Sequence, residues 1–286
     1  MMSDKKEMKL FDPLKLDSLR EALQSEMVNW FDQHYYRIGS RFLPSVTTVL
    51  GASPKWYLGN WRGDVGNAEA DRIMKEAQIH GSNVHWYLNH LLNGGSLVFN
   101  KETVEKGFIN VKDQFEFLHI YKVVQFLNIV KPKILMSEEI LWSDKYEFAG
   151  TMDLLMDVEE GEYPVNGAKP IFLEGGIYVA DLKTGKSIGN EAFWQTSAYA
   201  EALKEHTGLQ VAGTMILHTQ SGNAKGIEGF GVKVRNSEEV SLDFENFLKV
   251  YEVWKIAPNP TKPKIFQMPL LLKLENNLTI KKERTN

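Results

Sequence analysis

Near residue 133, the spacing of apolar residues along the chain changes. Residues 64–92 and 108–130 carry apolar side chains at helical spacing, and we expect a long helix over each range. The second helix should end before the proline at position 132, because proline cannot donate to the helix hydrogen bonds. Beyond this point the chain contains three runs of β-branched and aromatic residues, over 134–142, 148–158 and 171–182. Such runs, bounded by turn formers, predict a three-stranded meander.

The C-terminal half alternates between the two patterns again. We expect a helix over 191–206, strands over 210–218 and 230–235, and a helix over 240–256. A strand–helix–strand passage normally places two parallel strands in one sheet. The predicted fold is therefore α/β, bordering on α+β, with a mixed central β-sheet flanked by helices.

The portion before residue 133 is predicted to be mainly helical. Residues 14–31 have the apolar spacing of a helix, 35–38 resemble a short strand, and Ser45 is a credible N-cap for the apolar run after it. We expect residues 1–132 to pack on a core formed by 133–257. A C-terminal tail over 258–286 would follow, with one compact domain overall.

The amino-acid composition excludes several kinds of functional site. The chain contains no cysteine, which excludes disulfides, thiolate zinc sites, iron–sulfur clusters and cysteine nucleophiles. Its 33 basic and 37 acidic residues give a formal net charge of -4. That balance does not exclude a polyanionic partner, because binding depends on where the charges lie. The chain has neither a signal-peptide pattern nor a stretch near the ~20 apolar residues of a membrane span, so we expect a soluble, cytoplasmic protein without a membrane partner.

Two acidic residues and a lysine lie at informative places in the predicted strands. Asp153 closes a G-T-M-D sequence at the start of one strand, and Asp181-Leu182-Lys183 ends another. Because side chains alternate along a strand, Asp181 and Lys183 share a face while Leu182 points into the core. Two carboxylates and the Leu182 carbonyl are hard oxygen ligands, which suit Mg²⁺ or Mn²⁺.

A lysine beside such ligands would orient an attacking water and offset the charge that builds on a phosphate. The alternative is a simple ion pair on one face of the strand, worth ~1 kcal/mol or less. Gln195 and Tyr199 lie four residues apart on the following helix and so share a face. His85 lies within the earlier long helix. Each of these three residues alone would be an ordinary helix residue.

In the order H…GxxD…DxK…QxxxY, the set resembles the PD-(D/E)XK nuclease superfamily. The similarity is to the RecB-like exonuclease branch, which includes mitochondrial genome maintenance exonucleases and related phage proteins. The segment L-P-S-V-T-T-V-L at 43–50 also resembles the opening of those members. The resemblance covers about residues 35–220 and implies a restriction-endonuclease-like core.

The resemblance also implies a role for each residue. His85, Asp153, Asp181 and the Leu182 carbonyl would be the metal ligands, and Lys183 would be the catalytic lysine acting with the two acids. Gln195 and Tyr199 would orient the site or contact the DNA backbone. The cofactor would be Mg²⁺ or Mn²⁺, without an iron–sulfur cluster.

The chain departs from the family pattern in two ways. The proline of the superfamily's name is absent before Asp153, although G-x-x-D is usual in this branch. A carboxylate often found on the preceding strand could be Glu138 or Glu139. These neighbours face opposite ways, so the sequence leaves the choice open. The long connection over 159–170 has no explanation in the sequence.

Aromatic and cationic residues alternate in K-W-Y-L-G-N-W-R at 55–62. Bases stack on aromatic rings while phosphates meet lysine or arginine, so this segment is a candidate for single-stranded DNA binding. Packing of the aromatic rings between the helical portion and the sheet is the more common explanation. The candidate DNA-binding residues are Ser45, Thr47, Lys55, Trp56, Trp61 and Arg62.

The expected function is therefore a metal-dependent DNA exonuclease that acts on single strands or DNA ends. It would serve recombination, repair or phage replication in a bacterial or phage-infected cell. A helicase or recombination protein is a candidate partner. The alternative is a nucleic-acid-binding module that retains the nuclease fold without cutting, because one fold hosts many functions. A third interpretation is a structural protein in which the arrangement is coincidental.

Overall fold

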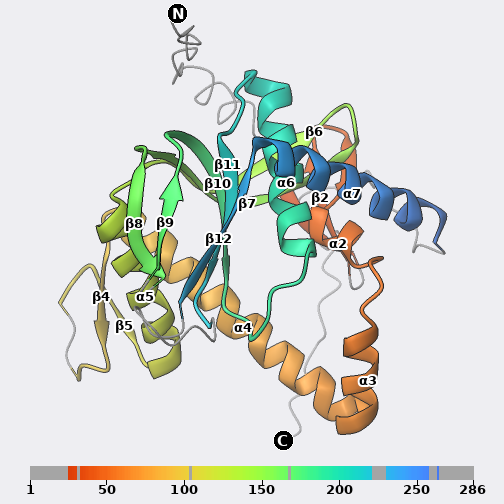
Figure 1. The fold of residues 1–286 in the computed structure, drawn as a ribbon. Coiled ribbons are helices and arrows are strands. Elements are labelled where there is room, and N and C mark those ends of the chain that lie inside the picture. Colours follow the sequence, from red (N-terminus) through yellow and green to blue (C-terminus); the bar gives the residue numbers. More distant parts are fainter. Residues whose placement is uncertain are drawn as a thin grey trace, which may run out of the picture.

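A mixed five-stranded β-sheet with helices on both faces forms the centre of the protein (Figure 1). The computed structural model describes residues 25–30, 33–102, 105–166, 169–220, 230–257 and 263. The strand order across the sheet is β12-β11-β10-β7-β6. The predicted fold class is therefore confirmed. The strands are β6 (Lys133–Ser143), β7 (Phe148–Val158), β10 (Gly176–Lys183), β11 (Gly213–His218) and β12 (Gly231–Asn236).

The predicted meander is present, with an insertion. Strands β6 and β7 pair antiparallel, and so do β7 and β10. Between β7 and β10 lies a hairpin of β8 (Gly161–Asn166) and β9 (Lys169–Leu173), which explains the long connection. The single strand predicted over 171–182 was therefore wrong. The break falls at Glu174 and Gly175, and β10 begins at Gly176, whose φ of 141° favours glycine.

The second half of the sheet follows the expected crossover. Helix α6 (Glu191–Thr207) connects β10 to β11, and these two strands pair parallel. Gly208 ends α6 in the left-handed conformation that glycine favours. Strand β12 then pairs antiparallel with β11, and helix α7 (Ser237–Ile256) follows it.

Apolar side chains fill both faces of the sheet. One core lies under α6, α7 and the short helix α2 (Val46–Leu50) and includes Leu155 and Val179. The other lies under α4 (Asn67–Leu92) and α5 (Gln114–Val130) and includes Leu154 and Leu182. Alternate residues of one strand thus serve opposite cores. Burial of each such side chain stabilises the fold by roughly 1.5–3 kcal/mol.

The portion before residue 133 contains more strand than expected. Residues predicted as helix form β1 (Ser25–Trp30), which pairs with β2 (Gln33–Ile38). The rest of the predicted helix over 14–31 lies outside the described residues. Strand β3 (Arg41–Pro44) completes this small sheet, and Ser45 caps α2 as predicted. The strand pairing overrides a weak helical spacing.

Both long helices also begin later than predicted. Phe108–Val111 is strand β5, which pairs with β4 (Ser96–Phe99). Helix α5 begins only after Asp113, whose carboxylate accepts the backbone N–H groups of Phe115 and Glu116. The helix predicted over 64–92 is interrupted at Gly66, where φ is 84°.

Gly66 separates α4 from α3 (Trp56–Val65), and the two helices form an arm at the lower right of Figure 1. Arg62 of α3 pairs with Asp71 of α4 (2.5 Å) and holds the corner of this arm. Among the described residues, no helix combines the length and apolarity needed to cross a membrane. The predicted tail over 258–286 lies outside the described residues except for Pro263.

Candidate metal centre

The end of β10 carries a buried acid and a half-buried lysine on one face, as predicted. The Asp181 side chain is 2 % exposed, and its Oδ2 lies 2.8 Å from Lys183 Nζ. Leu182, between them, is buried in the opposite core. The alternation of the strand therefore points both polar side chains toward α6.

Asp153 lies in the middle of β7 rather than at the start of a strand. Its Oδ2 accepts a hydrogen bond from the Leu182 backbone N–H at 2.7 Å. This bond joins neighbouring strands and places the second carboxylate beside the Asp181-Leu182-Lys183 segment. The two predicted acids thus come together.

His85 reaches the same place from α4. The buried neighbours Val84 and Leu88 fix α4 on the sheet. One helical turn after His85, Ser137 of β6 donates to Asn89 (3.0 Å). One turn before it, Gly81 approaches Thr184 so closely that a Cβ would lie 3.4 Å from the threonine hydroxyl. The helix is therefore held against the sheet on both sides of the imidazole.

The His85 ring bridges three elements. Its Nδ1 lies 3.1 Å from Glu138 Oε1 and 3.5 Å from Asp153 Oδ2. Its Nε2 lies 3.1 Å from the Leu182 carbonyl oxygen. Since the partners on both sides are acceptors, both ring nitrogens donate, as in an imidazolium ion. Burial lowers the pKa of His85, but the charges of Asp153 and Glu138 outweigh it and raise the pKa to about 9.

Glu138, not Glu139, is the carboxylate that β6 contributes. Ser137 pairs with Leu154 and Glu139 with Met152, so Glu138 lies opposite Asp153. The φ of Glu138 is 54°, an uncommon conformation for a residue other than glycine. The sequence could not make this choice, because both acids occur in one strand and the register was unknown.

The donor set fits a divalent cation. His85, Glu138 and Asp153 each offer one ligand atom, and these atoms lie within 4.8 Å of one another. Asp181 Oδ1 is buried and accepts no hydrogen bond from any residue that the structure describes. Burial raises the pKa of Asp181, because a charged carboxylate is poorly solvated at this place. Imidazole nitrogen and carboxylate oxygens are ligands for Mg²⁺ or Mn²⁺.

A second cluster of possible ligands has a structural explanation. Asp144, Glu205 and His206 also lie close together. Glu205 accepts hydrogen bonds from the hydroxyl of Ser143 and from the backbone N–H of Asp144 (2.5 and 2.9 Å). His206 is bonded to the Trp142 carbonyl (2.7 Å). These side chains fix the turn after β6 to the end of α6.

Lys183 continues into a chain of polar contacts on α6. Its ammonium donates to Gln195 Oε1 (3.1 Å), and Gln195 Nε2 donates to Tyr199 OH (3.3 Å). Burial lowers the pKa of Lys183, but Asp181 and Asp153 outweigh it and raise the pKa, so the lysine is a cation. Tyr199 also lies against Gly150, where a Cβ would be 2.6 Å from the ring. The glycine of G-x-x-D leaves room for the tyrosine of Q-x-x-x-Y.

The sequence analysis missed one residue pair at this site. Tyr36 of β2 is hydrogen-bonded to Thr151 of β7 through their hydroxyl groups (2.9 Å), two residues before Asp153. Burial raises the pKa of Tyr36, with a contribution from the charge of Glu138. Thr151 belongs to the G-T-M-D sequence that contains Asp153. No motif in the segment around Tyr36 indicated a role for that residue.

The candidate DNA-binding residues occupy different environments. Ser45 is buried, and its hydroxyl accepts the Thr48 N–H at the start of α2, so its role is that of a cap. Thr47 is exposed, Lys55 is half-buried, and Trp61 is half-buried in α3. The side chain of Trp56 lies outside the described residues. Arg62 forms an ion pair with Asp71 within the α3–α4 arm.

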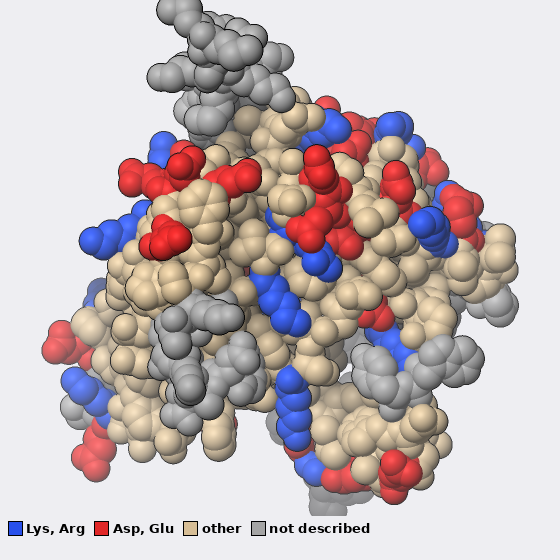
Figure 2. All heavy atoms as spheres, in the orientation of Figure 1, with Lys and Arg blue, Asp and Glu red and all other residues tan. Residues whose placement is uncertain are grey.

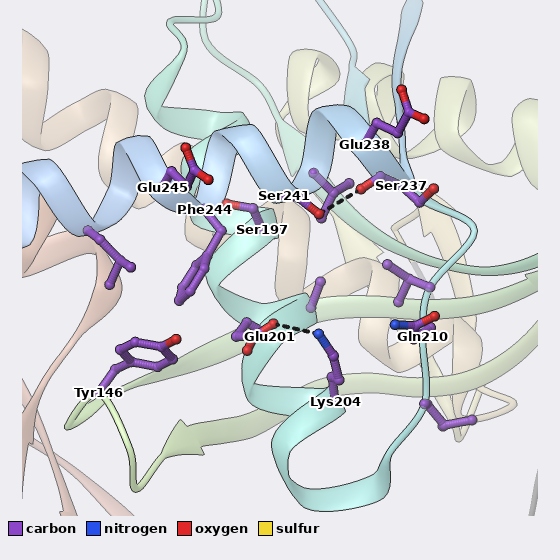
Figure 3. A pocket seen from close by; sticks show the side chains of 15 residues that line it. Tyr146, Ser197, Glu201, Lys204, Gln210, Ser237, Glu238, Ser241, Phe244 and Glu245 are labelled. Atoms are coloured by element: carbon purple, nitrogen blue, oxygen red, sulfur yellow. Dashed lines mark hydrogen bonds and ion pairs between the residues drawn. The ribbon is translucent and has the colours of Figure 1, made fainter.

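A hollow of about 480 Å³ between α6 and α7 is not part of the candidate centre (Figure 3). Its lining includes Phe244 of α7 and the Glu201–Lys204 pair of α6 (3.5 Å). It contains none of the predicted metal ligands.

A scan against protein-family models finds no match for this chain. A search of the curated proteins finds no similar sequence either.

Proposed function

We propose that this chain is a metal-dependent DNA exonuclease of the PD-(D/E)XK type, similar to the RecB-like branch. The proposal depends on one observation. Ligand atoms of His85, Glu138 and Asp153, from α4, β6 and β7, lie within 4.8 Å of one another, and Asp181 with Lys183 lies on the neighbouring strand β10. If these side chains had no common role, we would not expect α4, β6, β7 and β10 to bring them together.

His85, Glu138, Asp153 and Asp181 would hold Mg²⁺ or Mn²⁺, together with the Leu182 carbonyl. His85 would serve as a ligand in its neutral form, so that metal binding would release the proton that Asp153 and Glu138 favour. A bound divalent cation supplies Lewis acidity and stabilises negative charge on a phosphate. Asp181 and Asp153 keep Lys183 protonated, so its ammonium is available to a phosphate oxygen or to the attacking water. Gln195 holds the ammonium from the other side and orients it.

The substrate in this proposal is DNA, taken as a single strand or at an end. Lys183 adds a positive charge beside the ligands, which suits a phosphodiester better than an uncharged substrate. The reaction would belong to recombination, repair or phage replication. A non-cutting DNA-binding module is the second candidate, and the retained ammonium beside paired acids favours cutting over it.

The test is digestion of end-labelled single- and double-stranded DNA with Mg²⁺, Mn²⁺ or EDTA. Cleavage should need the metal and should fall at least about 100-fold in Asp181→Asn and Lys183→Ala. Glu205→Gln, which alters an acid of the second cluster, is the matched control and should cut like the parent. Circular dichroism verifies that the variants fold.

Two results would overturn the proposal. One is cleavage by Lys183→Ala at the parental rate, and the other is cleavage that EDTA leaves unchanged. DNA binding without calorimetric Mn²⁺ binding would favour the non-cutting module.

A further inference from the structure

A second hollow, of about 980 Å³, begins at the chain segment that follows Lys183 and is lined by none of the candidate metal ligands. Its lining includes Thr184, Gly185 and Lys186, the three residues that follow Lys183. The remaining walls come from α4, from the start of α5, from Trp61 of the α3–α4 arm and from Gln220 after β11. A strand with one phosphate at Lys183 would therefore have a neighbouring nucleotide at this hollow.

Part of the wall of this hollow consists of exposed apolar side chains. Met74 and Ile79 of α4 are 42 % and 52 % exposed, and Phe115 of α5 is 67 % exposed. All three side chains line the hollow, together with Ile73. Large apolar side chains gathered at one exposed place mark a binding site more often than isolated ones do. A flat aromatic ring such as that of Phe115 is a stacking partner for a base.

The acidic residues around the hollow already have partners. Asp113 accepts the first N–H groups of α5, Glu116 accepts from Asn83 (2.7 Å), and Glu76 pairs with Arg72 (2.5 Å). Lys186 is exposed and forms no ion pair within the described part of the chain. Figure 2 shows several lysine and arginine side chains one below another near the middle of the face drawn, with acidic side chains above and below them. Lys186 therefore offers the hollow a cation without an ion-pair partner among the described residues, while Asp113 and Glu116 keep their negative charge on the α5 side.

We infer that this hollow receives one unpaired base of the DNA strand whose backbone lies at Lys183. The inference rests on the proposed function and specifies its substrate as single-stranded DNA. A base can lie against Phe115 only when it is unpaired and free of its stack. Lys186 would hold the phosphate of the same nucleotide at the rim.

The experiment uses the full chain and single-stranded oligonucleotides that carry one abasic residue at successive positions from the labelled end. At one position the missing base should lower kcat/KM by roughly 5- to 150-fold, the range that loss of one stacked base predicts. Phe115→Ala should cut the intact strand more slowly by a similar factor and lose the sensitivity to that abasic position. Phe115→Tyr keeps the ring and should retain it.

Leu118→Ala is the matched control. Leu118 is 42 % exposed on the same helix and is not part of the lining. It should behave like the parent. Both alanine variants alter exposed side chains, so loss of folding is not expected, and thermal unfolding verifies this.

The outcomes separate the two proposals. If the parent cuts every abasic strand as fast as the intact one, or if Phe115→Ala equals the parent, the base site is wrong while the nuclease stands. If the parent cuts no DNA with any metal, the proposed function fails. In that case, 2-aminopurine fluorescence in a bound strand decides the base site, since quenching that Phe115→Ala abolishes would support it and unchanged fluorescence would contradict it.

Discussion

Glu138, rather than its neighbour Glu139, lies at the candidate centre, a choice that the sequence pattern left open. It lies beside His85 with a left-handed backbone, and no other residue of β6 has a positive φ. Such conformations cost of order 1–3 kcal/mol and persist where the surrounding structure imposes them. In this protein the conformation accompanies a contact of 3.1 Å between the Glu138 carboxylate and the His85 imidazole.

We predict that Glu138→Gln weakens Mn²⁺ binding at least about 10-fold, because it removes one charged ligand. Glu139→Gln, one residue along the same strand, should bind like the parent. Isothermal titration calorimetry compares the two. Equal affinities for the two variants would show that β6 contributes no ligand.

His119 gives a prediction for pH. It is buried on α5, bonded to the hydroxyl of Thr219 (2.5 Å), with Lys122 bonded to the Thr219 carbonyl (2.9 Å). Burial, helped by the charges of His80, Lys122 and His218 and opposed by Asp113, lowers the pKa of His119 to about 4. The unfolded chain, with a histidine pKa near 6.5, therefore takes up more protons than the folded one.

The free energy of unfolding should consequently be highest above about pH 6.5. It should fall by up to about 1.4 kcal/mol per pH unit toward pH 4 on account of this group. His119→Asn, which retains a hydrogen-bonding group, should make the curve shallower in that window. Urea denaturation from pH 4.5 to 7.5 measures both curves, and parallel curves would contradict the assignment.

At the scale of helices and strands, periodicity predicted the sheet better than the helical portion. The runs at 134–142 and 148–158 became β6 and β7 nearly as expected, because buried strands are continuously apolar. Short runs such as Phe108–Val111 are ambiguous, since only a partner strand in space distinguishes them from the start of a helix. The same limit explains why β1 was assigned to a helix.

The residues of the candidate centre also differ in whether the local sequence could predict them. Asp181 and Lys183 followed from alternation along one strand, and Gln195 with Tyr199 from spacing along one helix. The choice of Glu138 needed the β6–β7 register, and Tyr36 needed the contact between two sheets. Neither relation is local in the sequence.

The contact between β7 and α6 gives a prediction at this scale. Gly150→Ala would place a Cβ 2.6 Å from the Tyr199 ring and should destabilise the protein by about 1–3 kcal/mol through overpacking. Gly63→Ala in α3 meets nothing within 4 Å and should be neutral or stabilising. Chemical denaturation compares the variants. If Gly150→Ala proved as stable as Gly63→Ala, β7 and α6 could move apart without loss of stability, and the prediction would be wrong.

At the scale of the molecule, the candidate centre lies where both faces of the sheet contribute. Asp153, Asp181 and Lys183 point toward α6, whereas His85 comes from α4 on the other side. A ligand that binds only the folded state stabilises all these parts together.

We predict that Mn²⁺ at 100 times its dissociation constant raises the free energy of unfolding by about 2.7 kcal/mol. His85→Ala should lose most of this gain, whereas Glu205→Gln in the second cluster should keep it. Differential scanning calorimetry with and without EDTA measures the shift. An equal gain in both variants would place the ion elsewhere.

Helix α4 carries both His85 and, six residues earlier, Ile79 of the apolar wall. At 1.5 Å per residue these positions are about 9 Å apart along one rigid rod. An ion that fastens the imidazole to the sheet therefore also steadies the surface on which a base would rest. We therefore expect binding of the cation and binding of the strand to strengthen each other, because coupling between two sites is reciprocal.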